Sequence, residues 1–414
     1  MTHLPLNHHK PLIMHIDLDS CFASIEQQAN PFLRNKPVVV AAYTTPNGCI
    51  LSPSKEAKKY GIKTGMRLKD AQNLCSRLLV LPTDPPKYRQ VHAQFKKIFS
   101  DYSPTVIPKS IDEAIIDFAV SPFKEYNLQL IAQEIKTRIR REIGDWISCS
   151  IGIATNRFWA KMGASLHKPD GLEMITPERI LPILKTLQLI DLYGINTRYQ
   201  ARLNIQGIMT PVDFFNAKES VLRHQVFKGI LGYYWNLRLR GWEIDDYEYQ
   251  QKSIGHQYAL GEKTADRIKL LRLLMKLCEK TGRRLRRSGQ TARGLHLGCL
   301  YEDHTYWHHG HKFPTETYTT EEIFGKAKWI FDQQPQKKVV IKMAITSYDF
   351  SPFHTGQTSL FDGDIEKKRN VAQALDKIND RYGEFVIVPA LMMDMDTTIK
   401  DAIAFGRIRE LDIF

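Results

Sequence analysis

The sequence predicts an α+β fold divided into several domains. Apolar runs of strand length occur at residues 12–16, 115–118 and 147–154, and amphipathic stretches with helical periodicity occur at 88–102 and 128–143. Strands alternating with helices in this order are typical of a sheet with helices packed on one face, the split βαβ arrangement. With 414 residues, the chain is long enough for about two to four domains, each with its own core.

A small basic subdomain is expected after the first strand. Residues 21–28 have helical character, and residues 37–42 form a short apolar run that predicts a buried strand. Helices are then expected at 54–60, ending at Gly61, and at 68–79. A further helix after the strand at 147–154 carries Lys161, which completes the elements expected before residue 179.

Residues 179–240 predict a run of helices joined by glycines. The segment 192–196, followed by a helix and Gly207, is similar to a helix-hairpin-helix, in which backbone N–H groups meet a DNA phosphate. Asn196 occupies the position of the usual second glycine, so an ordinary turn between two helices stays an alternative. Residues 243–249 are acidic and aromatic, as expected of a linker.

From residue 252 onward the sequence predicts a βαββ domain. Its strands are expected at 253–259, 293–301 and 338–348, and its long helix at 264–288. The helix ends in the arginine-rich segment 283–287, which is either a solvated helix end or a set of phosphate contacts; the basic surroundings favour phosphate.

The charge of the chain indicates a polyanionic partner. The net charge is +13, and residues 251–350 alone carry 18 Lys and Arg against 10 Asp and Glu. A concentration of positive charge in one domain is typical of nucleic-acid binding, although a basic surface also occurs without it.

Cysteine usage and hydropathy suggest a cytoplasmic protein. The six cysteines include no CxxC motif and no Cys/His spacing typical of zinc, so they are expected to be reduced thiols. No apolar run approaches the length needed to cross a bilayer, so no membrane association is expected.

Two acidic segments suggest a catalytic metal site. Asp17 ends the first apolar run, and the adjacent Asp112 and Glu113 begin the run at 115–118. If the two strands are neighbours, the three carboxylates converge and repel one another unless divalent cations neutralise them. Oxygen ligands favour Mg²⁺ or Mn²⁺, and two such ions support phosphoryl transfer. The competing interpretation of an Asp-Glu pair is a solvated turn.

Several motifs together resemble the Y-family translesion DNA polymerases of the DinB and UmuC type. They are the DLDSCF segment at 17–22, KPVVV at 36–40, EAK at 56–58 with GIK at 61–63, SIDEA at 110–114, GIA at 152–154 with Lys161, and KSIG at 252–255. The motifs follow the family's order over residues 11–350. Features of both branches occur, so the branch stays open.

The resemblance implies a right-hand polymerase with a ferredoxin-like palm, small fingers, a helical thumb and a C-terminal little finger that grips DNA. The implied boundaries are palm 1–24 and 88–178, fingers 25–87, thumb 179–242, linker 243–251, little finger 252–350 and a C-terminal tail 351–414.

It also implies the site residues. Asp17, Asp112 and Glu113 correspond to catalytic carboxylates that hold two Mg²⁺ ions, with Leu18 as a further ligand through its carbonyl oxygen. The implied nucleotide-binding residues are Cys21, Phe22, Ser52, Lys55, Lys58 and Lys161. Phe22 corresponds to the ring that crowds a ribose 2′-OH, with core packing as the alternative. Lys55 and Lys58 replace a Tyr and an Arg common in the DinB branch, so a ring contact and a bidentate fork are lost.

The segment 357–362 is similar to the peptide by which bacterial polymerases bind the sliding clamp. Gln357, Leu360 and Phe361 are its anchors, and an apolar pair of this kind suits a hydrophobic pocket on a partner.

The predicted function is template-directed, low-fidelity DNA synthesis in translesion repair, with primer-template DNA, dNTPs and the clamp as partners. Two alternatives are a catalytically silent DNA-binding scaffold of the same family, which the carboxylates argue against, and a nucleotidyl cyclase, which needs neither a thumb nor a basic gripping domain.

Overall fold

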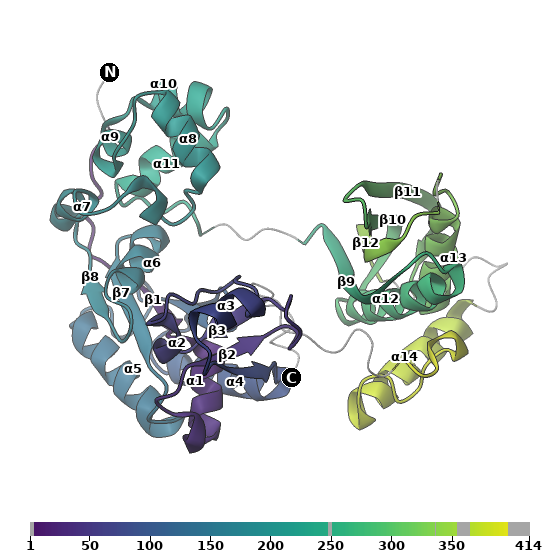
Figure 1. The fold of residues 1–414 in the computed structure, drawn as a ribbon. Coiled ribbons are helices and arrows are strands. Elements are labelled where there is room, and N and C mark those ends of the chain that lie inside the picture. The colour runs from purple at the N-terminus through teal and green to yellow at the C-terminus, as the bar shows by residue number, and fades with distance from the viewer. Residues whose placement is uncertain (1–3, 247–250, 336, 354–364, 396–414) are drawn as a thin grey trace. The chain divides into compact units, whose positions relative to one another are not determined.

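The computed structural model describes residues 4–246, 251–335, 337–353 and 365–395 (Figure 1). The described residues fall into two compact units, one up to residue 246 and one from residue 251 onward.

The first unit is built on a five-stranded sheet in the order β5-β6-β1-β7-β8. The strands are β1 (Ile13–Leu18), β5 (Thr105–Pro108), β6 (Glu113–Asp117), β7 (Cys149–Ala154) and β8 (Leu172–Met174). The central strand β1 is antiparallel to both β6 and β7, and β8 is parallel to β7. All six residues of β1 are buried, because helices cover the sheet on both faces.

Helices pack on both faces of this sheet (Figure 1). On one face, α4 (Pro85–Ser100) and α5 (Leu128–Glu142) share a core with Met14 and Ile16. On the other, α6 (Arg157–Leu166) packs against Ile13 and Ile115. The prediction of helices on one face only is therefore wrong. Neighbouring residues of β1 point to opposite faces, and Ile13 on one face is buried as Met14 and Ile16 are on the other, so both faces are covered.

A second, three-stranded sheet in the order β3-β2-β4 forms the core of the small subdomain. It contains β2 (Val38–Ala41), β3 (Ile50–Pro53) and β4 (Leu79–Pro82), with the helices α1 (Cys21–Ala29), η1 (Pro31–Leu33), α2 (Lys55–Lys58) and α3 (Leu68–Leu74). The helix predicted at 68–79 ends at Leu74. Residues from Leu79 on instead pair with β2, because the N–H of Leu79 donates to the carbonyl of Pro37.

Residues 177–239 form the predicted run of helices. They are α7 (Pro177–Leu184), η2 (Leu189–Asp191), α8 (Thr197–Ile205), α9 (Pro211–Asn216), α10 (Glu219–Val221), η3 (Leu222–Val226) and α11 (Leu231–Leu239). Gly194, before α8, has a φ of 96°, which favours glycine. Asn196 caps α8, since its side-chain oxygen accepts a hydrogen bond from the N–H of Tyr199. The residue that replaces the second glycine thus stabilises the start of a helix.

The second unit has a four-stranded antiparallel sheet in the order β11-β10-β12-β9. Its elements are β9 (Ser253–Thr264), α12 (Arg267–Arg287), β10 (Gln290–Tyr301), β11 (Tyr306–Thr317), α13 (Thr320–Phe331), β12 (Val340–Pro352), α14 (Ile365–Tyr382) and η4 (Ala390–Met392). The predicted βαββ pattern lacked β11 and α13. The outward positions of β11 carry His and Lys, so its apolar alternation is weak in the sequence.

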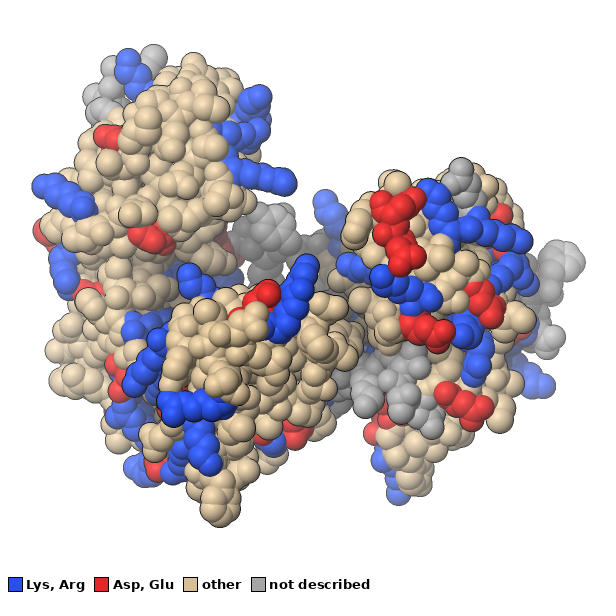
Figure 2. Space-filling model, in the orientation of Figure 1, with Lys and Arg blue, Asp and Glu red and all other residues tan. Residues whose placement is uncertain are grey.

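The arginines at the end of α12 pair with carboxylates of α14. Arg286 makes two hydrogen bonds to Asp376, of 2.5 and 2.9 Å, and Arg283 donates to Asp380 at 2.7 Å. Both arginine side chains are buried. Figure 2 shows Lys and Arg next to Asp and Glu on the visible face of this unit. The expectation that these arginines contact phosphate is therefore wrong for Arg283 and Arg286, because carboxylates of the same chain already neutralise them.

Asp376→Ala is expected to lower the free energy of unfolding of the second unit by about 3 kcal/mol, because it leaves the buried guanidinium of Arg286 without its bidentate carboxylate. Urea denaturation measures the change, and Lys377→Ala, at the next and exposed position, is the matched control. A loss below about 0.5 kcal/mol, the range of ordinary surface substitutions, would contradict this account of the pair.

Among the described residues, no helix combines the length and the apolar character needed to cross a membrane.

Candidate active site

Pairing of β1 with β6 brings the two acidic segments together. Asp17 lies directly opposite Glu113 in the register of the two strands, and the N–H of Leu18 donates to the carbonyl of Asp112 at 2.9 Å. Antiparallel neighbours bring side chains that are opposite in register within about 5.5 Å at Cβ. Carboxylates 96 residues apart in the sequence therefore meet at one end of the sheet.

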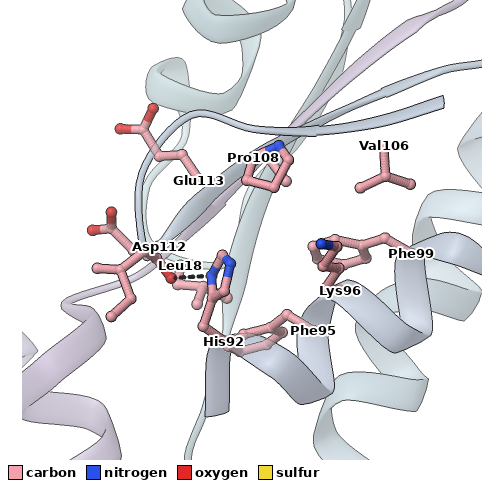
Figure 3. A pocket seen from close by; sticks show the side chains of 11 residues that line it. Leu18, His92, Phe95, Lys96, Phe99, Val106, Pro108, Asp112 and Glu113 are labelled. Carbon is pink, nitrogen blue, oxygen red and sulfur yellow. Dashed lines mark hydrogen bonds between the residues drawn. The ribbon is translucent and has the colours of Figure 1, made fainter. Parts of the chain in front are cut away.

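The turn before β6 carries Asp112 and is stabilised by two polar contacts. The Oγ of Ser110 donates to Asp112 Oδ1, and Nδ1 of His92, on α4, lies 2.9 Å from the carbonyl oxygen of Ile111. Figure 3 shows His92 beside a small cavity lined by apolar side chains of α4, with Asp112 and Glu113 at its edge. Asp112 precedes the strand and Glu113 is its first residue, as expected of a pair that reaches one site from a strand start.

Two lysines and a histidine surround the carboxylates. Nζ of Lys161, on α6, lies 2.6 Å from Glu113 Oε2 and 3.8 Å from Asp17 Oδ2. Lys168 pairs with Asp17 Oδ1. Nε2 of His15, a buried residue of β1, lies 3.5 Å from Glu113 Oε2. In the described part of the chain, ligand atoms of His15, Asp17 and Glu113 lie within 4.8 Å of one another, a grouping that can hold a metal ion.

The pKa values of the adjacent Asp112 and Glu113 are shifted in opposite directions. Burial raises the pKa of Asp112, and the charges of Asp17 and Glu113 add to this rise against the hydrogen bond from Ser110. Burial also acts to raise the pKa of Glu113, but the hydrogen bond with His15 and the charge of Lys161 outweigh it and lower the pKa to about 2. Without a bound cation, the site therefore tolerates the charge of Glu113 and resists that of Asp112.

The predicted nucleotide-binding residues surround this cluster at different depths. Cys21 is buried, and its burial, with the charges of Asp112 and Asp17, raises the pKa of its thiol well above the ordinary value. Burial and the charge of Lys168 lower the pKa of Lys58. Nζ of Lys55 donates to Ser148 Oγ at 2.8 Å. The Oγ of Ser52 accepts from the N–H of Ala23 at 3.3 Å.

Phe22 has a packing role in the structure. Its side chain is 2% exposed, and its ring stacks on that of Tyr88 with 4.4 Å between centroids and 10° between planes. Core packing and contact with a sugar are both compatible with this position, because Phe22 lies in the first turn of α1, four residues after the end of β1.

Sequence reasoning missed Lys168 and His15. Lys168 follows α6 in the segment His167-Lys168-Pro169-Asp170-Gly171, whose Pro and Gly mark a turn that could have been noticed. His15 lies two residues before Asp17 on the same strand, so both side chains share a face of the sheet. The predicted clamp residues Gln357, Leu360 and Phe361 lie outside the described residues.

Comparisons with known proteins identify the family of the chain. The impB/mucB/samB family model matches residues 16–165, and the model of that family's C-terminal domain matches residues 251–360. The DNA polymerase IV of Pelotomaculum thermopropionicum is 30% identical over 391 residues, which cover 92% of this chain and 95% of that protein. The DNA polymerase IV 1 of Bacillus subtilis is 29% identical over 384 residues, which cover 91% of this chain and 92% of that protein.

A solved structure of a Y-family DNA polymerase chimera has the same fold. It superposes with a TM-score of 0.71 at 23% identity and covers 81% of this chain and 98% of the chimera. The predicted right-hand α+β fold, with its little-finger domain, is confirmed. Since the two family models match more than half of its residues, this chain belongs to the impB/mucB/samB family, the Y-family DNA polymerases.

Proposed function

We propose that Asp17, Asp112 and Glu113 are the catalytic carboxylates of this translesion DNA polymerase. The relatives named DNA polymerase IV make the chain a DNA-directed DNA polymerase that binds a DNA template. The observation that supports the site assignment is the pairing of β1 with β6, in which Asp17 lies opposite Glu113 and the N–H of Leu18 donates to the carbonyl of Asp112. Within this cluster the buried charge of Asp112 is opposed by the charges of Asp17 and Glu113, and a bound cation would relieve that repulsion.

The donor set fits two Mg²⁺ ions. Asp17, Asp112, Glu113 and the carbonyl of Leu18 offer only oxygen ligands, which Mg²⁺ and Mn²⁺ prefer. When bound, two such ions activate an attacking oxygen and stabilise a leaving phosphate oxygen. Lys161 and Lys168, which now pair with these carboxylates, show that the site attracts positive charge.

The lysines around the carboxylates suit the triphosphate of a dNTP. Lys161 and Lys168 can exchange a carboxylate partner for a phosphate oxygen, and Lys55 and Lys58 add positive charge from α2. Cys21, Phe22 and Ser52 lie where β1, α1 and β3 meet and would contact the nucleotide there. Lys168 thus joins the six nucleotide-binding residues predicted from the sequence.

The same proposal assigns the parts of the chain. Residues 1–24 and 88–178 form the palm, 25–87 the fingers, 179–242 the thumb, 243–251 the linker, 252–350 the little finger and 351–414 the tail. In the little finger, the positive charge left after the α12 arginines pair internally would meet DNA phosphates.

Primer extension tests the function. The purified full chain, with Mg²⁺, dNTPs and a primer-template, is expected to extend the primer by copying the template, and to continue past damaged bases in a panel of templates. Extension that ignores the template sequence, or its absence despite tight DNA binding, would refute the proposal; the second result would favour the silent scaffold.

The proposed clamp contact has its own test. Leu360→Ala combined with Phe361→Ala is expected to remove most of the affinity for a purified bacterial sliding clamp, because anchor residues contribute about 2 kcal/mol or more each. Extension without clamp and the melting temperature are expected to stay at the wild-type values. A double mutant that melts lower and still binds the clamp would assign the pair to the core of the protein.

A further inference from the structure

The second aspartate of the Asp17-Leu18-Asp19 segment does not join the carboxylate cluster. Asp19 is 2% exposed, against 7% for Asp17. Asp17 faces the ammonium groups of Lys161 and Lys168, whereas the carboxylate of Asp19 is turned to hydroxyl and backbone donors. In the sequence the two aspartates look equivalent, since both follow the first strand and both belong to the motif that resembles the polymerase family. Their surroundings differ, so their roles differ as well.

Three neutral donors bind the carboxylate of Asp19. Oδ1 accepts from the Oγ of Ser150 at 2.8 Å. Oδ2 accepts from the Oγ of Ser148 at 2.8 Å and from the backbone N–H of Asp170 at 2.8 Å. A buried carboxylate with this many hydrogen bonds is held in one orientation and fixes the groups that donate to it.

The contact with Ser148 leads to Lys55. The same Ser148 Oγ that donates to Asp19 accepts a hydrogen bond of 2.8 Å from Nζ of Lys55. Lys55 is the first residue of α2, and one hydroxyl group connects its ammonium to Asp19, the residue after β1. The position of this lysine therefore depends on the orientation of the Asp19 carboxylate.

The contact with Asp170 leads to Lys168. Asp170 has a φ of 61°, in the left-handed region, and its N–H points to Asp19. Its own carboxylate pairs with Lys136 at 3.0 Å and with Arg140, both on α5. The turn is thus held on one side by α5 and on the other by Asp19. Lys168, two residues earlier in this turn, pairs with Asp17.

We propose that Asp19 is a positioning residue for the triphosphate of the incoming nucleotide. It holds Lys55 through Ser148 and Lys168 through the N–H of Asp170, and so fixes two ammonium groups relative to Asp17. Cations held in place before the ligand arrives bind it without the entropy cost of ordering long side chains. The inference rests on the proposed polymerase function, because it assumes that these lysines meet a nucleotide.

Asp19→Asn tests the proposal with little change of shape. The amide retains one acceptor oxygen and cannot accept from all three donors, so Lys55 and Lys168 lose their fixed positions. The expected result is a fall in kcat/KM for dNTP of roughly 10²-fold, mostly as a rise in KM, with a half-saturating Mg²⁺ concentration equal to that of wild type. The affinity for dNTP of the full chain on a dideoxy-terminated primer-template should fall in parallel.

Ser148→Ala and Lys55→Met separately test the hydrogen bonds that connect Asp19 to Lys55. If Ser148 positions Lys55, the KM effect of Lys55→Met should largely disappear in the Ser148→Ala background. Ser121→Ala is the matched control, because this buried serine donates to the carbonyl of Tyr102, away from the site, and should leave KM unchanged.

Three results would overturn the proposal. A shifted Mg²⁺ requirement in Asp19→Asn would make Asp19 a metal ligand, and a lower melting temperature with unchanged KM would make it purely structural. Additive effects of Ser148→Ala and Lys55→Met on KM would show that Ser148 does not position Lys55. A wild-type chain that fails to extend any primer would instead refute the polymerase function on which the proposal rests.

Discussion

Asp112→Asn and Glu113→Gln are both expected to abolish primer extension, but to change stability in opposite directions. Each removes a carboxylate expected to hold Mg²⁺, at a cost of several kcal/mol of transition-state stabilisation, roughly 10³-fold in rate. DNA affinity should stay at the wild-type value, because neither side chain belongs to the proposed grip.

The stability difference follows from the two pKa shifts. The pKa of Asp112 is higher in the folded than in the unfolded chain, so its contribution to stability is lost as the pH rises through the folded pKa, and at pH 7 its charge destabilises the fold. The pKa of Glu113 is lowered to about 2, so its charge stabilises the fold at pH 7, and this is lost only as the pH falls toward 2. In EDTA, Asp112→Asn should therefore melt at or above the wild-type temperature and Glu113→Gln below it.

Asp117→Asn is the matched control, since Asp117 ends the same strand β6 away from the cluster. It should extend primers as wild type does. Near-normal extension by Asp112→Asn or Glu113→Gln would refute the catalytic assignment, and equal melting temperatures for these two variants would refute the opposite pKa shifts.

Phe22→Ala is expected to admit ribonucleotides roughly 10²-fold more readily relative to dNTPs, because the ring would no longer crowd a ribose 2′-OH. Base selection should change much less, since the effect is steric and acts at the sugar. Single-nucleotide insertion kinetics with matched dNTP and rNTP pairs measure both.

Removal of this ring also opens a cavity in the core, where Phe22 stacks on Tyr88. Tyr88→Ala is the control, because it disturbs the same stack from the other side and leaves the Phe22 ring in place. Both variants should melt below wild type, but only Phe22→Ala should lose discrimination against rNTPs. If both variants keep it, Phe22 serves in core packing alone.

Local sequence patterns predicted most elements of the first unit. The apolar strands with acidic ends, the amphipathic helices α4 and α5, and the glycine-joined helices of 177–239 each have a periodicity that burial demands, and all are present. The helix predicted at 68–79 was wrong beyond Leu74, because pairing with β2 is a contact between distant segments that no local pattern reveals.

The carboxylates Asp17, Asp112 and Glu113 could be predicted from the sequence, because charged residues next to buried strands are unusual unless they bind a ligand. The side chains that surround each carboxylate could not be predicted. Glu113 has a pKa of about 2 because Lys161 and His15 fold against it. The pKa of Asp112 is raised because the fold buries this carboxyl group and places Asp17 and Glu113 near it.

For the α12 arginines and Asp19 as well, the residue type could be read from the sequence but the partner could not. The sequence by itself determined that the chain has a basic C-terminal domain and an Asp-Leu-Asp motif at a strand end. Only the tertiary structure decided that Arg283 and Arg286 are neutralised by α14, and that Asp19 binds Ser148, Ser150 and Asp170 instead of joining Asp17. The physical reason is that electrostatic and hydrogen-bond energies depend on distance and burial, and for segments about 90 to 150 residues apart these are set by the packing of the whole unit.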